Sequence, residues 1–200
     1  MLAVVSWVTL GGAIPALAQQ IDLDASAGAG KGAWRAAASG QWRLAAGSRL
    51  TLSTGLRLTY YAGKPASYRN QGSITATLPD RLEIDPAVFG LNVMIGAKLR
   101  LVKFLSAGAN IDVAGVAAGP ARQESGVALR PARGSLLLYG DNDRGSLNSE
   151  FFVAAAVGSR LEFRGGMSHY VVGYRATQGA AATRYLRFDT VPFVGVRWRP

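Results

Sequence analysis

Apolar and polar residues alternate without a break along the segment Arg49 to Tyr61, which reads RLTLSTGLRLTYY. Leucines and Tyr60 occupy even-numbered positions, whereas Arg49 and Arg57 occupy odd-numbered positions. A period of two residues predicts a β-strand with one apolar face and one polar face. At about 3.3 Å per residue, such a segment is long enough to cross the hydrocarbon of a bilayer, which a tilted transmembrane strand does in about 9–11 residues.

The same alternation recurs in eight segments, with tight turns alternating with longer connections at 62–86, 119–145 and 175–183. Only the Gly28–Gly32 connection departs from this order, because it is a tight turn on the long-loop side. An even number of antiparallel strands, with short turns at one rim and long loops at the other, predicts a closed all-β barrel. The expected strands are residues 21–29, 33–45, 49–61, 88–102, 105–117, 147–157, 160–174 and 185–198.

The long connection at 119–145 contains a pattern of its own. Val127 to Arg130 and Ser135 to Tyr139 flank the sequence Pro131-Ala132-Arg133-Gly134, which predicts a small hairpin beyond the main sheet. Its exposed strand edges offer an extracellular protein partner a place to add by strand pairing.

The first eighteen residues carry no charge and end in Ala16-Leu17-Ala18, a small-x-small cleavage pattern before Gln19. A run this short, interrupted by glycines and Pro15, is typical of a secretory signal peptide rather than of a transmembrane anchor. We therefore expect residues 1–18 to be a signal peptide and the barrel to comprise residues 19–200.

Composition narrows the function classes. A length of 200 residues with 49% hydrophobic residues is typical of one domain, and the absence of cysteine excludes disulfides and thiolate metal sites. The net charge of +10 is spread along alternating segments rather than clustered, so nucleic-acid binding is not expected. No cofactor is expected either.

Three features beyond export indicate which face of the strands is inside. The apolar faces carry no charged residue between strand ends, as expected where a lipid-facing charge costs about 2–4 kcal/mol. The polar faces carry both signs of charge among small residues, which favours a packed lumen. Aromatic residues near strand ends predict two interfacial girdles, formed by Trp34, Tyr60, Phe89 and Phe188 toward the long loops and by Trp42, Phe163 and Trp198 toward the short turns.

In these features, residues 21–200 resemble the small outer-membrane β-barrels of Gram-negative bacteria, the class that contains OmpX and the transmembrane part of OmpA. The resemblance lies in architecture rather than in a motif. It implies an eight-stranded antiparallel up-and-down transmembrane β-barrel in the bacterial outer membrane, with short periplasmic turns and longer extracellular loops. It also implies contact with outer-membrane lipid and lipopolysaccharide.

A barrel of eight strands encloses a lumen that side chains fill, and charges buried there must be paired. Closure of the barrel places the first strand beside the last and the second, which predicts that Asp22 and Asp24 pair near the periplasmic rim with Arg197 and Arg43. The residues expected in this lumen charge network are Asp22, Asp24, Arg35, Arg43, Arg49, Arg57, Lys98, Arg100, Asp112, Glu150, Arg160, Glu162, Arg164, Arg187, Asp189 and Arg197.

Three functions fit this pattern, and a structural or surface-interaction barrel is the first expectation. A narrow gated channel through the charged lumen is the second. The third is a lipid-modifying enzyme, for which His169 and the adjacent Ser168 are the candidates, with Glu150 and Glu162 on neighbouring strands. Strand parity directs His169 to lipid and Ser168 to the lumen, so no catalytic residue is assigned.

Overall fold

The computed structural model describes residues 21–72, 78–137, 146–179 and 181–200 of the chain. The signal peptide expected over residues 1–18 lies outside these residues. Strands and turns make up the described part, and no helix in it is long and apolar enough to cross a membrane.

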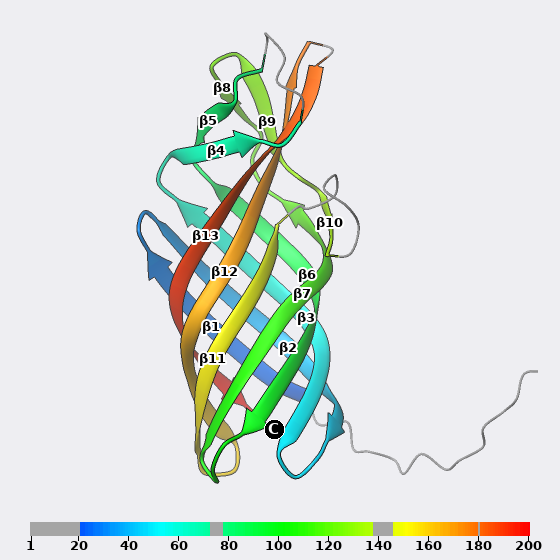
Figure 1. Cartoon of the computed structure of the whole chain (residues 1–200), viewed down its shortest axis with the longest axis vertical. Helices are drawn as coiled ribbons and strands as arrows, with labels where there is room; N and C mark the ends of the chain where they lie inside the picture. Colours follow the sequence, from blue (N-terminus) through cyan, green and yellow to red (C-terminus); the bar gives the residue numbers. More distant parts are fainter. Residues whose placement is uncertain (1–20, 73–77, 138–145, 180) are drawn as a thin grey trace, which may run out of the picture.

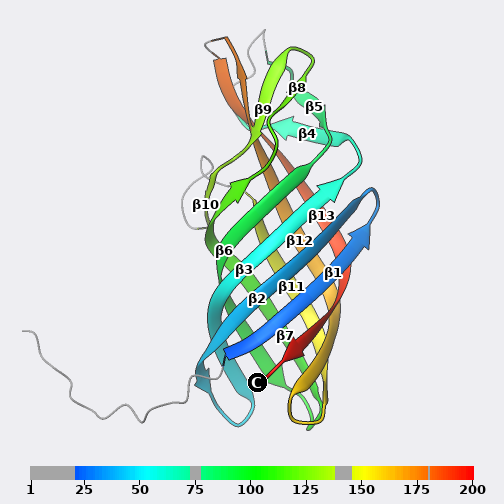
Figure 2. The same ribbon diagram turned by 180° about the vertical axis from the view of Figure 1, so that it is seen from behind.

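Eight long antiparallel strands close into a barrel, because β1 pairs with β2 on one side and with β13 on the other (Figures 1 and 2). The predicted closed eight-stranded antiparallel barrel is confirmed. The strands of the barrel are β1 (Ile21–Gly30), β2 (Ala33–Ala46), β3 (Leu50–Gly63), β6 (Ala87–Arg100), β7 (Leu105–Ala118), β11 (Leu147–Val157), β12 (Leu161–Gln178) and β13 (Ala181–Trp198).

The two faces of the barrel wall are opposite to those of a soluble protein. In β3, the outward Leu58 is 55% exposed, whereas the neighbouring inward Arg57 is 1% exposed. The same alternation holds in β1, where Leu23 is exposed and Asp22 and Asp24 are buried. The period of two residues alone produces this separation, because successive side chains point to opposite sides of a strand.

Two strands extend well beyond the rim of the barrel. β12 and β13 remain paired as far as Gln178 and Ala181, so most of the connection expected at 175–183 is the tip of a long hairpin (Figure 1). We call this end the upper rim, and the end with the short turns the lower rim. In the sequence, Gly179 and a run of alanines interrupt the alternation, and this interruption predicts a loop. In the structure, the chain turns at Gly179, whose φ of 56° is readily adopted by glycine.

Five short strands lie within the two long connections at the upper rim. The hairpin expected from Val127 to Tyr139 is wrong, since its first arm pairs with β12 and its second arm with β7, and Tyr139 lies outside the described residues. Pairing with β12 buries Val127 and Leu129, which an isolated hairpin would leave in water. The short strands are β4 (Ala66–Asn70), β5 (Arg81–Ile84), β8 (Arg122–Glu124), β9 (Val127–Pro131) and β10 (Gly134–Leu136).

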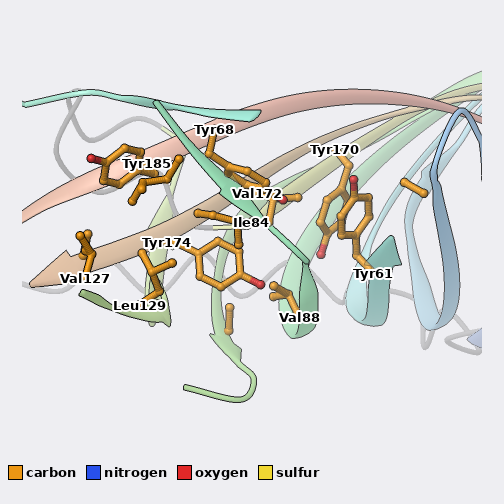
Figure 3. Close-up of a cluster of buried hydrophobic side chains, with 14 of the residues drawn as sticks. Tyr61, Tyr68, Ile84, Val88, Val127, Leu129, Tyr170, Val172, Tyr174 and Tyr185 are labelled. Carbon is orange, nitrogen blue, oxygen red and sulfur yellow. The ribbon is translucent and has the colours of Figure 1, made fainter. Parts of the chain in front are cut away.

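The strands β4, β5, β8 and β9, together with the upper parts of β12 and β13, form a unit that we call the cap. Its strands are neighbours in the order β5, β4, β13, β12, β9 and β8, and an ion pair of 2.8 Å between Arg122 and Asp85 joins its two edges. The cap encloses an apolar core of its own (Figure 3). Buried members of this core include Tyr68, Leu78, Leu82, Ile84, Val127, Leu129, Val172, Tyr174, Ala176 and Tyr185.

Candidate functional site

Glu150 is the centre of the charge network that fills the lumen. Its carboxylate lies 2.8 Å from Arg35, 3.0 Å from Arg57 and 3.3 Å from Arg164. Asn110 also donates a hydrogen bond to it, over 3.1 Å. All five side chains are buried, and they come from five strands of the barrel. Alternation explains why each points inward, and closure of the barrel brings them together.

Below Glu150, the network continues to the lower rim. Asp22 pairs with Arg43 at 2.7 Å, and Asp24 pairs with Arg164 and with Arg197, the latter at 3.4 Å. Closure of the barrel predicts these two arginines as partners of the two aspartates, and the structure pairs Asp22 with Arg43 and Asp24 with Arg197. At the same level, Glu162 accepts hydrogen bonds from Lys98 at 2.7 Å and from Arg199 at 2.6 Å.

Above Glu150, Asp112 ends the main cluster. It pairs with Arg57 at 3.1 Å and accepts hydrogen bonds from the Asn92 side chain at 2.7 Å and the Asn148 backbone at 3.1 Å. A separate ion pair of 2.8 Å joins Arg187 to Asp189 near the upper rim. Each buried carboxylate therefore has cations or amides as partners, as burial of charge requires.

Two phenylalanines share the lumen with these charges. Phe152 and Phe193 are buried and pack together, and the guanidinium of Arg35 lies 4.7 Å from the centre of the Phe193 ring. Arg164 lies 5.0 Å from the centre of the Phe152 ring. Guanidinium groups over aromatic faces are favourable in a desolvated site. The sequence signal for this packing is an aromatic residue on an otherwise polar strand face, at Phe152 and at Phe193.

Three of the expected lumen charges form no ion pair with the described residues. Arg49 lies in the turn before β3, Arg100 is the last residue of β6, and Arg160 lies in the turn before β12. All three are exposed, and no ion pair is present for them among the described residues. Parity gives the direction of a side chain, but at the lower rim the wall of the barrel ends and an inward direction leads into solvent.

The aromatic residues form rings at both ends of the apolar surface. At the upper rim, Tyr60 lies 5.0 Å from Trp34 and 4.4 Å from Phe89 between ring centres. Phe188 lies further around this rim and is 71% exposed. The lower residues Trp42, Phe163 and Trp198 lie on the outer face of β2, β12 and β13.

A pair of stacked tyrosines lies across the upper end of the lumen. The rings of Tyr61 and Tyr170 are 4.8 Å apart and inclined by 6°, and neither residue is exposed (Figure 3). Tyr61 donates a hydrogen bond to Asp189, which ties the stack to the upper ion pair. The cap core begins directly beyond this stack, so apolar side chains fill the lumen above the main charge cluster around Glu150 and Asp112.

The cap also holds buried phenol groups. Tyr185 donates a hydrogen bond of 2.5 Å to the backbone oxygen of Pro79, and the Ala87 N–H donates one of 3.0 Å to the Tyr174 oxygen. Burial raises the pKa of Tyr68 and of Tyr185 above the ordinary value, because the charged phenolate is desolvated there.

The enzyme candidates lie on opposite faces of β12. Ser168 is buried in the lumen and donates a hydrogen bond of 2.5 Å to Asn148. His169 points outward, where its Nδ1 lies 2.9 Å from the Thr190 hydroxyl and its ring packs against Phe151. The register of β12 with β13 is continuous through this region, so the two side chains do not meet. No group of three or more metal-ligating side chains occurs in the described part of the chain.

Comparisons with known proteins return little. No family model and no curated protein matches the chain. Among solved structures, the chain is similar to a major outer membrane protein from Thermus thermophilus, with a TM-score of 0.37 and 9% sequence identity over 92% of this chain and 100% of that one. The fold assignment rests on the strand pairings described above.

Proposed function

We propose that the chain is an integral β-barrel protein of the bacterial outer membrane with a structural or surface-interaction role. One observation carries this proposal: the barrel exposes apolar side chains outward and buries charged side chains inward. Soluble monomers rarely expose contiguous apolar surfaces beyond a few hundred Å². Leucines, valines and aromatic residues cover the outer face of the barrel, so lipid is the medium that suits this surface.

The backbone supports the choice of the outer membrane. A closed barrel satisfies every ladder hydrogen bond without water, which makes it one of the two structures that can span hydrocarbon. Among barrels that span a membrane, an even number of antiparallel strands is typical of the bacterial outer membrane. The signal peptide expected at residues 1–18 would supply the export route.

The cap supports a role at the cell surface rather than in transport. The Tyr61–Tyr170 stack and the cap core fill the space above the charged lumen. The cap is a folded unit with its own buried core, held on the paired β12–β13 hairpin. Segments presented in this way on a rigid scaffold are where binding residues concentrate.

Heat-modifiable gel mobility of the membrane fraction tests this proposal. The folded barrel should migrate faster in unheated detergent samples than after boiling, because the closed sheet resists detergent at room temperature. Fractionation should recover the protein with the outer membrane. Recovery in the soluble fraction, with one mobility before and after heating, would contradict the proposal.

A narrow gated channel is the second candidate, because paired charges follow one another along the lumen from Asp22 to Asp112. On this hypothesis the Tyr61–Tyr170 stack is the gate. Single-channel recording of the wild type and of a Tyr61→Ala, Tyr170→Ala double variant tests it. A wild type that opens in discrete steps would support a channel, whereas two silent proteins would exclude one.

A further inference from the structure

Three arginines lie side by side on the outer surface of the cap. Arg175 of β12 is the direct cross-strand partner of Arg130 on β9 and of Arg184 on β13. Arg130 and Arg175 are exposed and Arg184 is half-buried. Their side chains point away from the cap core, because the adjacent Leu129, Tyr174 and Tyr185 are buried in it.

The direct pairing of Arg130 with Arg175 is unfavourable for the isolated protein. Like charges directly opposite each other on neighbouring strands destabilise a sheet. Within the described ranges, no carboxylate lies at ion-pair distance from Arg130 or Arg175, nor from the nearby Arg133. Arg130 and Arg175 are neighbouring cations without acidic partners among the described residues. Such a pair is suited to binding an anion from another molecule.

The arginines line a hollow rather than a flat surface. Its volume is about 780 Å³, within the range of sites that hold whole small molecules. Guanidinium groups bind phosphate oxygens in pairs of parallel hydrogen bonds, and hydroxyl groups can add further donors. The side chains with suitable donors in this lining are Arg130, Arg133, Ser135, Arg175, Thr177 and Arg184.

The height of the hollow agrees with a lipid headgroup. Phe188, in the upper aromatic ring, faces Val171 across the β12–β13 pair, and Arg184 and Arg175 lie four residues further along their strands. Four residues extend about 13 Å along a strand, which gives roughly 9 Å of height at a tilt of about 45°. Aromatic belts lie at the headgroup level, and the polar layer of a bilayer is about 5–8 Å thick on each side, so the hollow lies at the outer edge of the headgroup layer.

We propose that this hollow binds the phosphate groups of a glycolipid in the outer leaflet. The inference rests on the proposed outer-membrane location, because the lipid must lie around the barrel at the level of the cap. Two phosphates on one headgroup would neutralise the Arg130–Arg175 pair and replace repulsion with charge-assisted hydrogen bonds. The cap would then anchor the barrel to the headgroup layer.

Binding of bisphosphorylated lipid A to the purified full chain in detergent micelles tests this site. The Arg130→Gln, Arg175→Gln double variant should bind it about tenfold or more weakly, as expected on loss of two charge-assisted contacts. The matched control is Arg49→Gln, Arg160→Gln, which removes two exposed charges at the lower rim and should leave affinity unchanged. Dephosphorylated lipid A should not bind measurably to the wild type.

Thermal unfolding gives a second readout. Without phosphate, Arg175→Gln should melt at a temperature equal to or above that of the wild type, because it relieves repulsion between neighbours. Adding the bisphosphorylated lipid should raise the melting temperature of the wild type and not that of the double variant.

Three results would overturn the proposal. The double variant could bind as the wild type does, or the lower-rim control could weaken binding equally, which would indicate attraction by net charge alone. Pyrophosphate could bind as tightly as the lipid, which would assign the hollow to a free phosphate ligand. Heat-modifiable mobility separates these outcomes from failure of the proposed location, since a barrel that shifts normally without binding lipid refutes only the site.

Discussion

At the scale of single residues, a few buried side chains with several ionic partners stabilise the charge network in the lumen. Glu150 holds three guanidinium groups, and no other carboxylate among the described residues lies so deep in the lumen with as many arginine partners. Removing one partner from a buried ionic cluster leaves uncompensated charge in a medium of low dielectric constant. The cost of such a change therefore exceeds the contribution of any single contact.

Glu150→Gln should destabilise the barrel by about 3–5 kcal/mol, because it removes the negative charge that Arg35, Arg57 and Arg164 surround. Urea unfolding in lipid vesicles, followed by tryptophan fluorescence, measures the change. Glu124→Gln is the matched control, since Glu124 is exposed in β8 and should give a difference near zero. Equal midpoints for the wild type and Glu150→Gln would contradict the central role of this residue.

Tyr68 differs from Glu150, whose buried carboxylate has several partners. The buried hydroxyl of Tyr68 has no hydrogen-bond partner among the described residues. Burial raises its pKa, so the folded cap favours the neutral phenol. This contribution to stability is complete below the ordinary tyrosine pKa of about 10 and is lost as the pH rises toward the higher folded value.

Tyr68→Phe should leave the cap as stable as the wild type at pH 7, or slightly more stable, and should make it more resistant to alkali. Removing an unsatisfied buried hydroxyl costs little, and phenylalanine cannot ionise. Limited proteolysis of the cap from neutral to strongly alkaline pH measures the effect. A variant cap that opens at the same pH as the wild-type cap would show that this phenol does not control alkaline opening.

At the scale of elements, the stability of the cap depends on its buried core more than on its seam, by which we mean the Arg122–Asp85 ion pair that joins its two edges. The Arg122–Asp85 pair that joins its edges is one-third to one-half exposed, and exposed ion pairs contribute about 0–1 kcal/mol. Leu129, by contrast, is fully buried against β12. Burial of apolar surface is therefore what keeps β8 and β9 on the β12–β13 hairpin.

Leu129→Ala should destabilise the cap by about 2–5 kcal/mol, whereas Arg122→Ala should cost less than about 1 kcal/mol. Proteolysis of the cap in intact barrels measures both, and the heat-modifiable shift shows whether the barrel itself remains folded. If Arg122→Ala opened the cap more than Leu129→Ala, the seam rather than the core would hold it.

At the scale of the whole molecule, the outer face of the barrel decides the environment. Leu56 lies near the middle of β3 and points outward, far from both rims. A cation at such a position meets hydrocarbon in a lipid-embedded barrel and water in a soluble one. The same substitution thus distinguishes two environments for one fold.

Leu56→Arg should lower barrel stability by about 2–4 kcal/mol in lipid vesicles, with a cost of only about 0–1 kcal/mol for Leu101→Arg near the lower rim. Folding yield and urea midpoints in vesicles provide the measurement. Equal stability of Leu56→Arg and the wild type would contradict the assignment of this face to lipid.

The sequence by itself determined the strands and the direction of their side chains. Alternation at a period of two assigns Arg57 inward and Leu58 outward without any tertiary information, and the count of strands predicts closure. It also predicts that Asp22 and Asp24 pair with Arg197 and Arg43, since closure makes the first strand a neighbour of the last and the second.

Only the tertiary structure decided which segments pair beyond the rim and which charges meet. The segment from Val127 pairs with β12 because burial against Tyr174 and Ala176 outweighs a local hairpin, and such competition depends on residues distant in sequence. The convergence on Glu150 and the row of Arg130, Arg175 and Arg184 depend on register between strands. Register arises from packing across the closed sheet, and a one-dimensional pattern does not encode it.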